Sequence, residues 1–155
     1  KEKKNINKVQ VKNKKAYHDY ELVEKVEAGI SLLGTEVKSL RNGQADLEGS
    51  FAKVQGNQCF LHGCKIAPYT QAGDNNHDPN RDKKLLLHRR QINKIAAKLQ
   101  QRGFTLVPLR IYFNERGLAK VELALARGKR QYDKRRTKTE RQQKKEVRDQ
   151  MKRFK

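Results

Sequence analysis

Hydrophobic and polar residues alternate along several short stretches of the chain, which is typical of strands that bury one face of a sheet. From Tyr17 the chain becomes strand-like: residues 20–26 alternate, and residues 28–34 continue with β-branched and aliphatic residues between glycines. Residues 50–69 contain two more, separated by Gln-Gly-Asn-Gln, and this arrangement predicts a hairpin. Residues 104–127 predict a second hairpin around Asn-Glu-Arg-Gly, and apolar residues alternate with other side chains in its return strand: Val121, Leu123 and Leu125.

Two other segments have the period of an α-helix. In residues 85–103 apolar side chains recur at intervals of three and four, and a glycine follows the last turn; they are Ile92, Ile95, Ala96 and Leu99. A shorter helix is expected over residues 35–43. Thr35 is its predicted N-cap, Glu36 lies in its first turn, and Gly43 ends it.

These elements predict a small domain that is mainly β, with about six short strands and two helices. Strands of this number either close into a small barrel or stack as a sandwich, and a barrel would leave no exposed edges. The polar connection between the first hairpin and the longer helix spans residues 70–84. Because this connection is long, we expect it to be either disordered or functional.

Charge divides the chain into three parts. The 155 residues carry a formal net charge of +20, of which residues 1–15 contribute +6, residues 16–127 contribute +5 and residues 128–155 contribute +9. We therefore expect a basic, flexible N-terminal segment over residues 1–15 and a folded domain over residues 16–127. Residues 128–155 then form a basic C-terminal tail.

The excess of positive charge indicates the class of partner. A pI near 10.2 favours a polyanion, with nucleic acid as the first choice and an anionic membrane surface as the second. No apolar run reaches the length of a membrane span, and no hydrophobic signal segment opens the sequence. We therefore expect a cytoplasmic protein that binds nucleic acid.

The sequence offers little that resembles catalytic or metal-site chemistry. Cys59, His62 and Cys64 lie close together, but a structural zinc site usually needs four ligands and no second cluster supplies the others. We interpret the two cysteines as half-buried strand residues, which point to opposite faces if residues 59–64 form one strand. No nucleophile–base pattern or phosphate-binding loop is present. We therefore expect neither an enzyme nor a bound cofactor.

The C-terminal tail is more than a lysine tract. Tyr132 and Asp133 interrupt its basic residues, and an aromatic ring can stack on an exposed base while cations follow the phosphates. This pattern favours RNA binding over a merely solvated charged surface. Residues 137–155 are good helix formers with a narrow apolar stripe of Val147, Met151 and Phe154. Because like charges repel along this helix, we expect it to form only on RNA.

Four segments, in the same order along the chain, resemble the SmpB family, the SsrA-binding proteins of bacteria: residues 13–20, 27–43, 78–92 and 126–135. The resemblance implies an OB-type antiparallel β-barrel with short helices and a basic C-terminal tail. It implies a monomer that binds the tRNA-like domain of tmRNA and, with EF-Tu and GTP, delivers it to stalled ribosomes for trans-translation. A general basic RNA chaperone or a ribosome-associated RNA-binding protein on the same barrel remains the alternative.

The matched positions imply three groups of site residues. The tmRNA-binding group comprises Asn13, Lys14, Glu36, Lys38, Arg41, Lys83, Lys84 and His88. The group expected at the decoding centre of the small ribosomal subunit, against its rRNA, comprises Gly128, Lys129, Tyr132, Asp133, Lys134 and Arg135. The group expected in the empty mRNA channel comprises Arg136, Lys138, Arg141, Lys144, Lys145, Arg148, Lys152 and Arg153. Three positions depart from the family pattern: many relatives have Arg in place of Lys83 and Glu in place of Gln91, and some carry a tryptophan near the place of Gln143.

Overall fold

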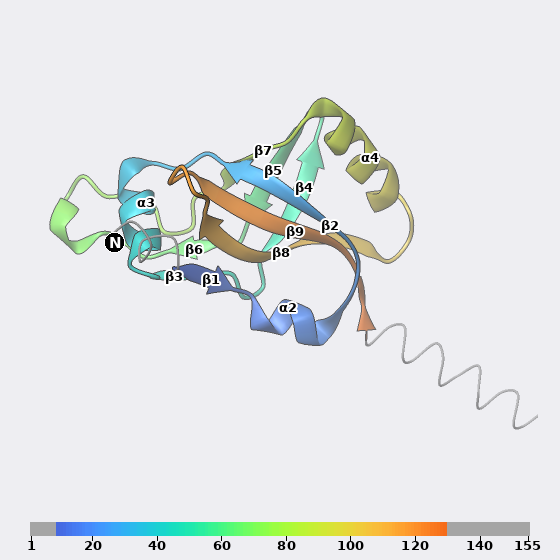
Figure 1. Ribbon diagram of the computed structural model, residues 1–155, viewed down its shortest axis with the longest axis horizontal. Coiled ribbons are helices and arrows are strands. Elements are labelled where there is room, and N and C mark those ends of the chain that lie inside the picture. Colours follow the sequence, from blue (N-terminus) through green and yellow to red (C-terminus); the bar gives the residue numbers. More distant parts are fainter. Residues whose placement is uncertain (1–8, 130–155) are drawn as a thin grey trace, which may run out of the picture.

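A ring of six antiparallel strands forms the body of the protein (Figure 1). The computed structural model describes residues 9–129. The ring runs β8-β4-β5-β7-β2-β9, and β9 pairs back to β8. Its strands are β2 (Tyr20–Ile30), β4 (Phe51–Gln55), β5 (Gln58–His62), β7 (Lys83–Leu86), β8 (Phe104–Phe113) and β9 (Ala119–Gly128). The arrangement confirms the prediction of a mainly β fold with a ring of about six strands.

Two of the strand pairings that close this ring are short. β4 and β8 share one residue pair, Ala52 with Leu106, whereas β2 and β7 share two pairs. The pairings of β2 with β9 and of β8 with β9 are long, and each contains one irregularity in its register. The ring is therefore an irregular closure around one core and not strictly a barrel.

Short elements decorate the ring (Figure 1). β1 (Gln10–Lys12) pairs with the outer edge of β8, and β3 and β6 form a separate two-stranded sheet. The bounds of the remaining elements are β3 (Ala45–Asp46), β6 (Lys65–Ile66), α2 (Lys14–Asp19), α3 (Gly34–Arg41), α4 (Arg89–Leu99) and the 3₁₀ turn η1 (Thr70–Ala72). Within residues 9–129, no helix is long and apolar enough to cross a bilayer.

The hydrophobic core fills the ring. The alternating residues of the second hairpin point inward as predicted, and Val121, Leu123 and Leu125 are all buried. The apolar face of α4 packs on this core, because Ile92 and Ile95 are buried while the neighbouring arginines and lysines are largely exposed. Removal of this apolar surface from water is the main force that holds the ring together.

Both predicted hairpins are present. β4 and β5 are joined at Gly56 and Asn57, where Gly56 has a positive φ of 61°. The connection of β8 to β9 begins at Asn114, whose side-chain oxygen accepts hydrogen bonds from the backbone of Arg116 and Leu118. A short polar side chain of this type commonly organises a turn in this way.

Order begins earlier in the chain than its composition suggested. Residues 10–12 form β1, and Tyr17 lies in α2 rather than in the strand predicted from residue 17. Ala16 explains this difference, because it is buried against Val107 and Leu109 on the outside of β8. A single small apolar residue among lysines gives a weak sequence signal, but it is sufficient to dock one helical turn.

Two predicted helix starts were wrong. Leu85 lies in β7 rather than in the longer helix, because it pairs with Cys59 and Ile30 and is buried in the core. Thr35 does not cap α3, because its hydroxyl bonds the ring of His77 instead. The N–H of Leu33 donates to the Glu36 carboxylate at the start of α3, which satisfies one free backbone donor there.

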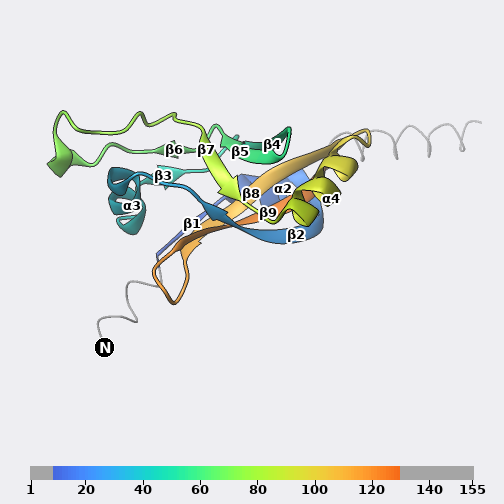
Figure 2. The same ribbon diagram turned by 90° about the horizontal axis from the view of Figure 1, so that it is seen from above.

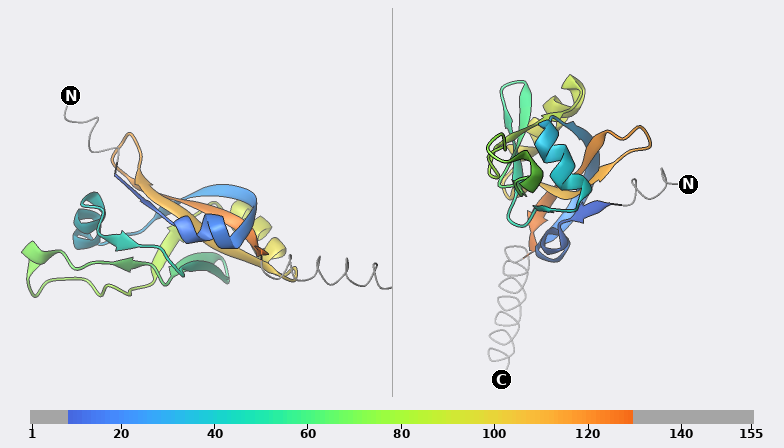
Figure 3. Two further views of the ribbon diagram at one scale, coloured as in Figure 1. Left: turned by 90° about the horizontal axis from the view of Figure 1, so that it is seen from below. Right: turned by 90° about the vertical axis from the view of Figure 1, so that its left-hand side faces the viewer.

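The views place α3 and the end of β9 at opposite ends of the molecule (Figures 1 and 2). α3 lies beside β3, β6 and the 67–82 connection, whereas Gly128 ends β9 beside α2. The left-hand view of Figure 3 shows the same separation from below. The segment that leads into the C-terminal tail therefore leaves the fold far from α3.

Candidate nucleic-acid interface

The exposed face of α3 carries two cations. Lys38 and Arg41 are exposed, whereas Ser39 and Leu40 are buried against the core. The Lys38 ammonium lies 5.4 Å from the centre of the Tyr69 ring, and the Arg41 guanidinium lies 5.7 Å from that of Phe113. Each ring positions the aliphatic stem of a cation while the charge stays in water, where it can meet a phosphate.

Glu36 lies on the buried side of the same helix. Its side chain has no exposed surface, and it accepts hydrogen bonds from the Leu33 N–H at 2.8 Å and from Arg81 Nη2 at 2.6 Å and Nε at 3.3 Å. Arg81 also donates to the Ser31 carbonyl at 3.2 Å. Glu36 therefore fixes the start of α3 to the end of the 67–82 connection, and an RNA bound to the surface would not touch it.

Lys83 is buried beside this pair. Its ammonium donates to the carbonyls of Cys64 and Arg81, each at 2.7 Å, and the residue has no exposed surface. Burial lowers the pKa of Lys83, and the neighbouring Cys64 and Glu36 act against this effect. Because its charge is used inside the fold, we leave Lys83 out of the proposed RNA-contacting surface.

The 67–82 connection is ordered by side chains rather than by regular structure. The His77 ring contacts the Thr35 hydroxyl at 2.8 Å and the Ile66 carbonyl at 2.9 Å. The Asn76 side chain accepts from the Tyr69 N–H at 2.8 Å and donates to the Tyr69 carbonyl at 2.7 Å. These bonds hold the Tyr69 backbone and bring the connection against α3. The segment expected to be either disordered or functional, residues 70–84, is therefore ordered, and its last two residues belong to β7.

Asn13 serves the fold and does not face solvent. It is buried, caps α2 by accepting from the Ala16 N–H, and donates to the carbonyls of Leu47 and Pro108 at 3.2 and 2.9 Å. The neighbouring Lys14 is exposed. Of the two N-terminal residues in the predicted group, only Lys14 can present its side chain to RNA.

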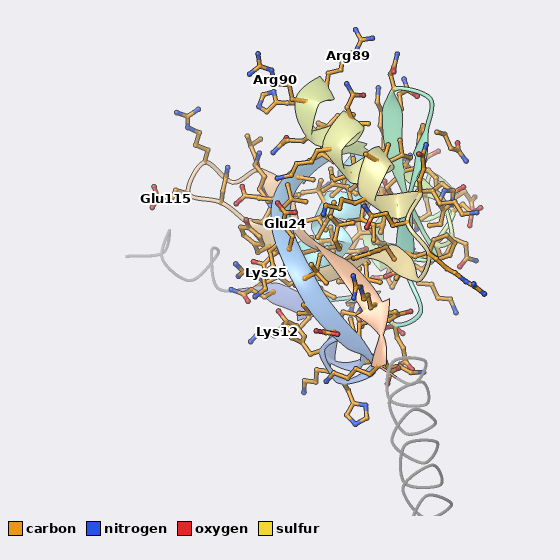
Figure 4. The ribbon with its side chains drawn as sticks, turned by 90° about the vertical axis from the view of Figure 1, so that its right-hand side faces the viewer. Lys12, Glu24, Lys25, Arg89, Arg90 and Glu115 are labelled. Atoms are coloured by element: carbon orange, nitrogen blue, oxygen red, sulfur yellow. The ribbon has the colours of Figure 1, made fainter. Side chains whose placement is uncertain are left out.

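Lys84 and His88 lie farther along, on β7 and at the start of α4. Both are exposed and line a groove of about 660 Å³, together with Gln91 and Lys120. Arg89 and Arg90 project outward from the first turn of α4 (Figure 4). The predicted tmRNA-binding residues therefore do not form one cluster, because β7 leads from the connection behind α3 toward α4 (Figures 1 and 2).

Sequence reasoning missed the aromatic partners. Tyr69 and Phe113 lie in segments far from α3 in sequence, and no local pattern pairs them with Lys38 or Arg41. An aromatic residue at the end of a predicted strand gives only a weak hint of such a contact. Of the group predicted for the decoding centre, Gly128 and Lys129 lie within the described residues. Gly128 ends β9, and Lys129 Nζ lies 3.5 Å from the Tyr17 carbonyl.

The other tail residues lie outside the described residues, as do the predictions that concern them. They are Tyr132, Asp133, Lys134 and Arg135, followed by Arg136, Lys138, Arg141, Lys144, Lys145, Arg148, Lys152 and Arg153. The helix predicted over residues 137–155 also lies outside the described residues.

The two cysteines are more deeply buried than predicted. Cys59 and Cys64 are both free, and both belong to the core of the ring; the strand that contains Cys59 ends at His62. They therefore do not lie on opposite faces of one strand. Burial raises the pKa of each thiol to about 11, which opposes the thiolate form that metals bind. Among residues 9–129, no group of three or more histidine, cysteine or acidic side chains is placed to hold a metal ion.

Comparison with known proteins adds a consistent picture. A family model described as SmpB protein matches residues 10–153. An SsrA-binding protein from Syntrophobacter fumaroxidans is 58% identical over 123 residues, which cover 79% of this chain and 76% of that protein. One from Thermus thermophilus is 54% identical over 126 residues, which cover 81% and 88%. A chain in the solved structure "tmRNA-SmpB: a journey to the center of the bacterial ribosome" is 52% identical, with a TM-score of 0.67 over 77% of this chain and 84% of that one.

Proposed function

The chain belongs to the SmpB family, and on that basis we propose that it binds the tRNA-like domain of tmRNA and serves trans-translation on the ribosome. The observation that carries this proposal is the high identity to SsrA-binding proteins over more than three quarters of the chain. The exposed cations of α3 support it, because RNA is bound mainly through its phosphates and by its shape. The protein acts by binding and catalyses no reaction itself.

The proposed partners follow from this role. The complex of the protein with tmRNA is joined by EF-Tu with GTP, and it enters ribosomes that have stalled on truncated messages. The protein acts as a monomer in the cytoplasm. Lys38 and Arg41, with Lys14, Lys84 and His88, form the proposed tmRNA-binding surface; Glu36, Asn13 and Lys83 hold its backbone in place.

The C-terminal tail has a separate proposed role. Gly128, Lys129 and the residues from Tyr132 to Arg135 occupy the decoding centre, which holds no codon–anticodon helix when tmRNA enters. The basic residues that follow lie in the empty mRNA channel as a helix. The position of Gly128 at the end opposite α3 supports this division, because one molecule can then hold tmRNA at one end and the small subunit at the other (Figures 1 and 3).

A competition assay tests the proposed RNA. Labelled tRNA-like domain of tmRNA is bound to the full chain and displaced with either unlabelled tRNA-like domain or elongator tRNA, across a series of salt concentrations. Preference for the tRNA-like domain should persist at raised salt, because purely electrostatic binding weakens steeply and without discrimination. Equal competition by the two RNAs at every salt concentration would support the alternative, a general RNA chaperone.

A truncation tests the division of labour. Removal of residues 128–155 should leave affinity for the tRNA-like domain largely intact and abolish peptide tagging on stalled ribosomes. If the truncated protein loses RNA affinity in proportion to tagging, the tail belongs to the RNA-binding surface and the proposed roles are not separate. Within the tail, Tyr132→Ala should impair tagging more than Tyr132→Phe, because stacking needs the ring and not the hydroxyl.

A further inference from the structure

The outer face of the β4–β5–β7 strands carries an aromatic and basic cluster, of which the proposed tmRNA-binding surface uses only Lys84. The pairing register places Phe51 opposite His62, Lys53 opposite Phe60, and Phe60 opposite Lys84. Neighbouring strands lie about 4.8 Å apart, so the two lysines flank Phe60 at a distance of about 10 Å between their backbones. We propose that this face is a second RNA-binding surface, which holds an unpaired nucleotide by stacking on Phe51.

Phe51 is prepared for such stacking. Its ring stacks on the His62 ring, with centroids 5.5 Å apart and planes inclined by 23°. The Lys53 ammonium lies 5.5 Å from the centre of the Phe51 ring. Phe51 keeps 36% of its surface exposed. A base that covers the open part of Phe51 would extend an existing stack and would bring its phosphates toward Lys53.

His62 holds this stack in position. Its Nδ1 lies 3.1 Å from the Asp82 carboxylate, while its Nε2 is buried and has no hydrogen-bond partner in the described part of the chain. Burying a polar atom without a partner costs free energy, so another interaction must keep the ring there. The stack with Phe51 and the contact with Asp82 supply that interaction and leave Phe51 little freedom to turn away.

The surroundings leave this surface open to a ligand. In Figures 2 and 3, β4 and β5 lie along one margin of the molecule, and no helix within residues 9–129 covers their outer side. α4 packs on β4 from the core side, where Val54 is partly buried. Asp82 follows Arg81 directly in the chain, so the cluster borders the connection that Glu36 anchors behind α3.

The chemistry of the cluster favours single-stranded RNA as the occupant. Stacking requires an open base face, which paired bases do not offer, and sequence-tolerant single-strand sites combine aromatic rings with cations in this way. OB-type folds use a sheet face for oligonucleotides. The apolar area is small, because Phe60 and His62 are each only partly exposed, and both lysines beside them match a phosphate backbone.

Tryptophan fluorescence tests the stack directly, because the chain contains no tryptophan. In Phe51→Trp, the single indole should be quenched in a saturable way by a short oligouridylate. An RNA duplex of the same length should quench it much less. The matched control is Leu118→Trp, which places an indole at an exposed position in the β8–β9 turn, on other elements of the fold. Equal quenching of both variants, or none at position 51, would overturn the proposal.

Affinity measurements separate stacking from charge. By fluorescence anisotropy, Phe51→Ala and Phe51→Leu should bind oligouridylate at least about fivefold more weakly than the parent chain, whereas Phe51→Tyr should retain binding. The salt dependence of binding should be unchanged in Phe51→Ala and reduced by about 0.7 in its logarithmic slope in Lys53→Gln. Unchanged affinity in Phe51→Ala, with native far-ultraviolet circular dichroism, would show that the ring does not contact RNA.

The same variants keep this inference distinct from the proposed function. Phe51→Ala should bind the isolated tRNA-like domain of tmRNA as the parent chain does, because Lys38 and Arg41 are unchanged. Loss of oligouridylate binding with intact binding of the tRNA-like domain confirms two surfaces. Loss of both at native fold contradicts a separate second surface and assigns Phe51 to the first.

Discussion

Glu36→Gln tests whether this carboxylate contacts RNA or positions the elements that do. The substitution keeps the shape of the side chain and removes its charge, so the hydrogen bonds from Arg81 at 2.6 and 3.3 Å lose their ionic partner. Loss of one partner of a buried ion pair costs about 3–5 kcal/mol. Because the Arg81 side chain is 34% exposed and stays partly hydrated, we expect a smaller loss of about 2–3 kcal/mol.

Urea unfolding of the RNA-free protein measures this loss. With a denaturant dependence of about 2 kcal/mol per molar urea, the midpoint should fall by about 1 M. Glu24→Gln is the matched control, since Glu24 pairs with Lys94 at 2.9 Å but the two side chains are 43% and 65% exposed. Its midpoint should move by no more than about 0.3 M, because exposed ion pairs contribute little.

RNA binding then separates the two roles. If Glu36 is a positioning residue, Glu36→Gln weakens RNA binding and lowers the stability of the free protein together. A variant that unfolds at the parent midpoint and yet loses affinity for the tRNA-like domain would refute this reasoning. That result would return Glu36 to direct RNA contact, as the family resemblance implied.

Three further predictions concern other parts of the fold. Asn13→Ala should lower the free energy of unfolding by about 2 kcal/mol in urea titrations, because it removes the cap of α2 and leaves two buried carbonyls without their donor; a loss below about 0.5 kcal/mol would contradict this. Lys38→Gln should leave the urea midpoint unchanged and reduce the logarithmic salt slope of tRNA-like domain binding by about one, and an unchanged slope would remove Lys38 from the interface. The two thiols should make stability fall as pH rises from about 9 to about 11, because the unfolded chain loses both protons while the folded chain keeps them up to a pKa of about 11. The loss should reach at most about 2.7 kcal/mol per thiol, and the difference between the parent chain and Cys59→Ala/Cys64→Ala isolates it; parallel pH curves would show that the thiols do not contribute.

Local pattern was sufficient for much of the fold. The alternation around Val121, Leu123 and Leu125 predicted a strand with one buried face, and the spacing of Ile92 and Ile95 predicted the helix that closes the core. These predictions succeed because side-chain direction repeats every two residues in a strand and about every 3.6 in a helix. The buried face of either element can therefore be recognised from the spacing of apolar residues within one short segment. The two turns were visible for a similar reason, since glycine and asparagine satisfy their backbone requirements locally.

The family resemblance also came from the sequence alone, because its four segments keep their residues and their order. It predicted site residues by position, and three of those residues proved to be buried: Asn13, Glu36 and Lys83. A charge in a sequence is normally a sign of exposure, and nothing near Lys83 in the chain shows that two carbonyls will surround its ammonium.

Only the tertiary structure decided which polar residues face solvent and which hold the fold together. Glu36 meets Arg81 across 45 positions of sequence, and Asn13 meets the Pro108 carbonyl across 95. The stack of Phe51 on His62 likewise depends on strand register, as does its place beside Lys53 and Phe60. The sequence by itself determined the two hairpins, the core of the longer helix, the charge and the family, but not β1 or β7. Closure of the strand ring determined which side chains from distant segments meet, because such contacts form only where the folded core brings those segments together.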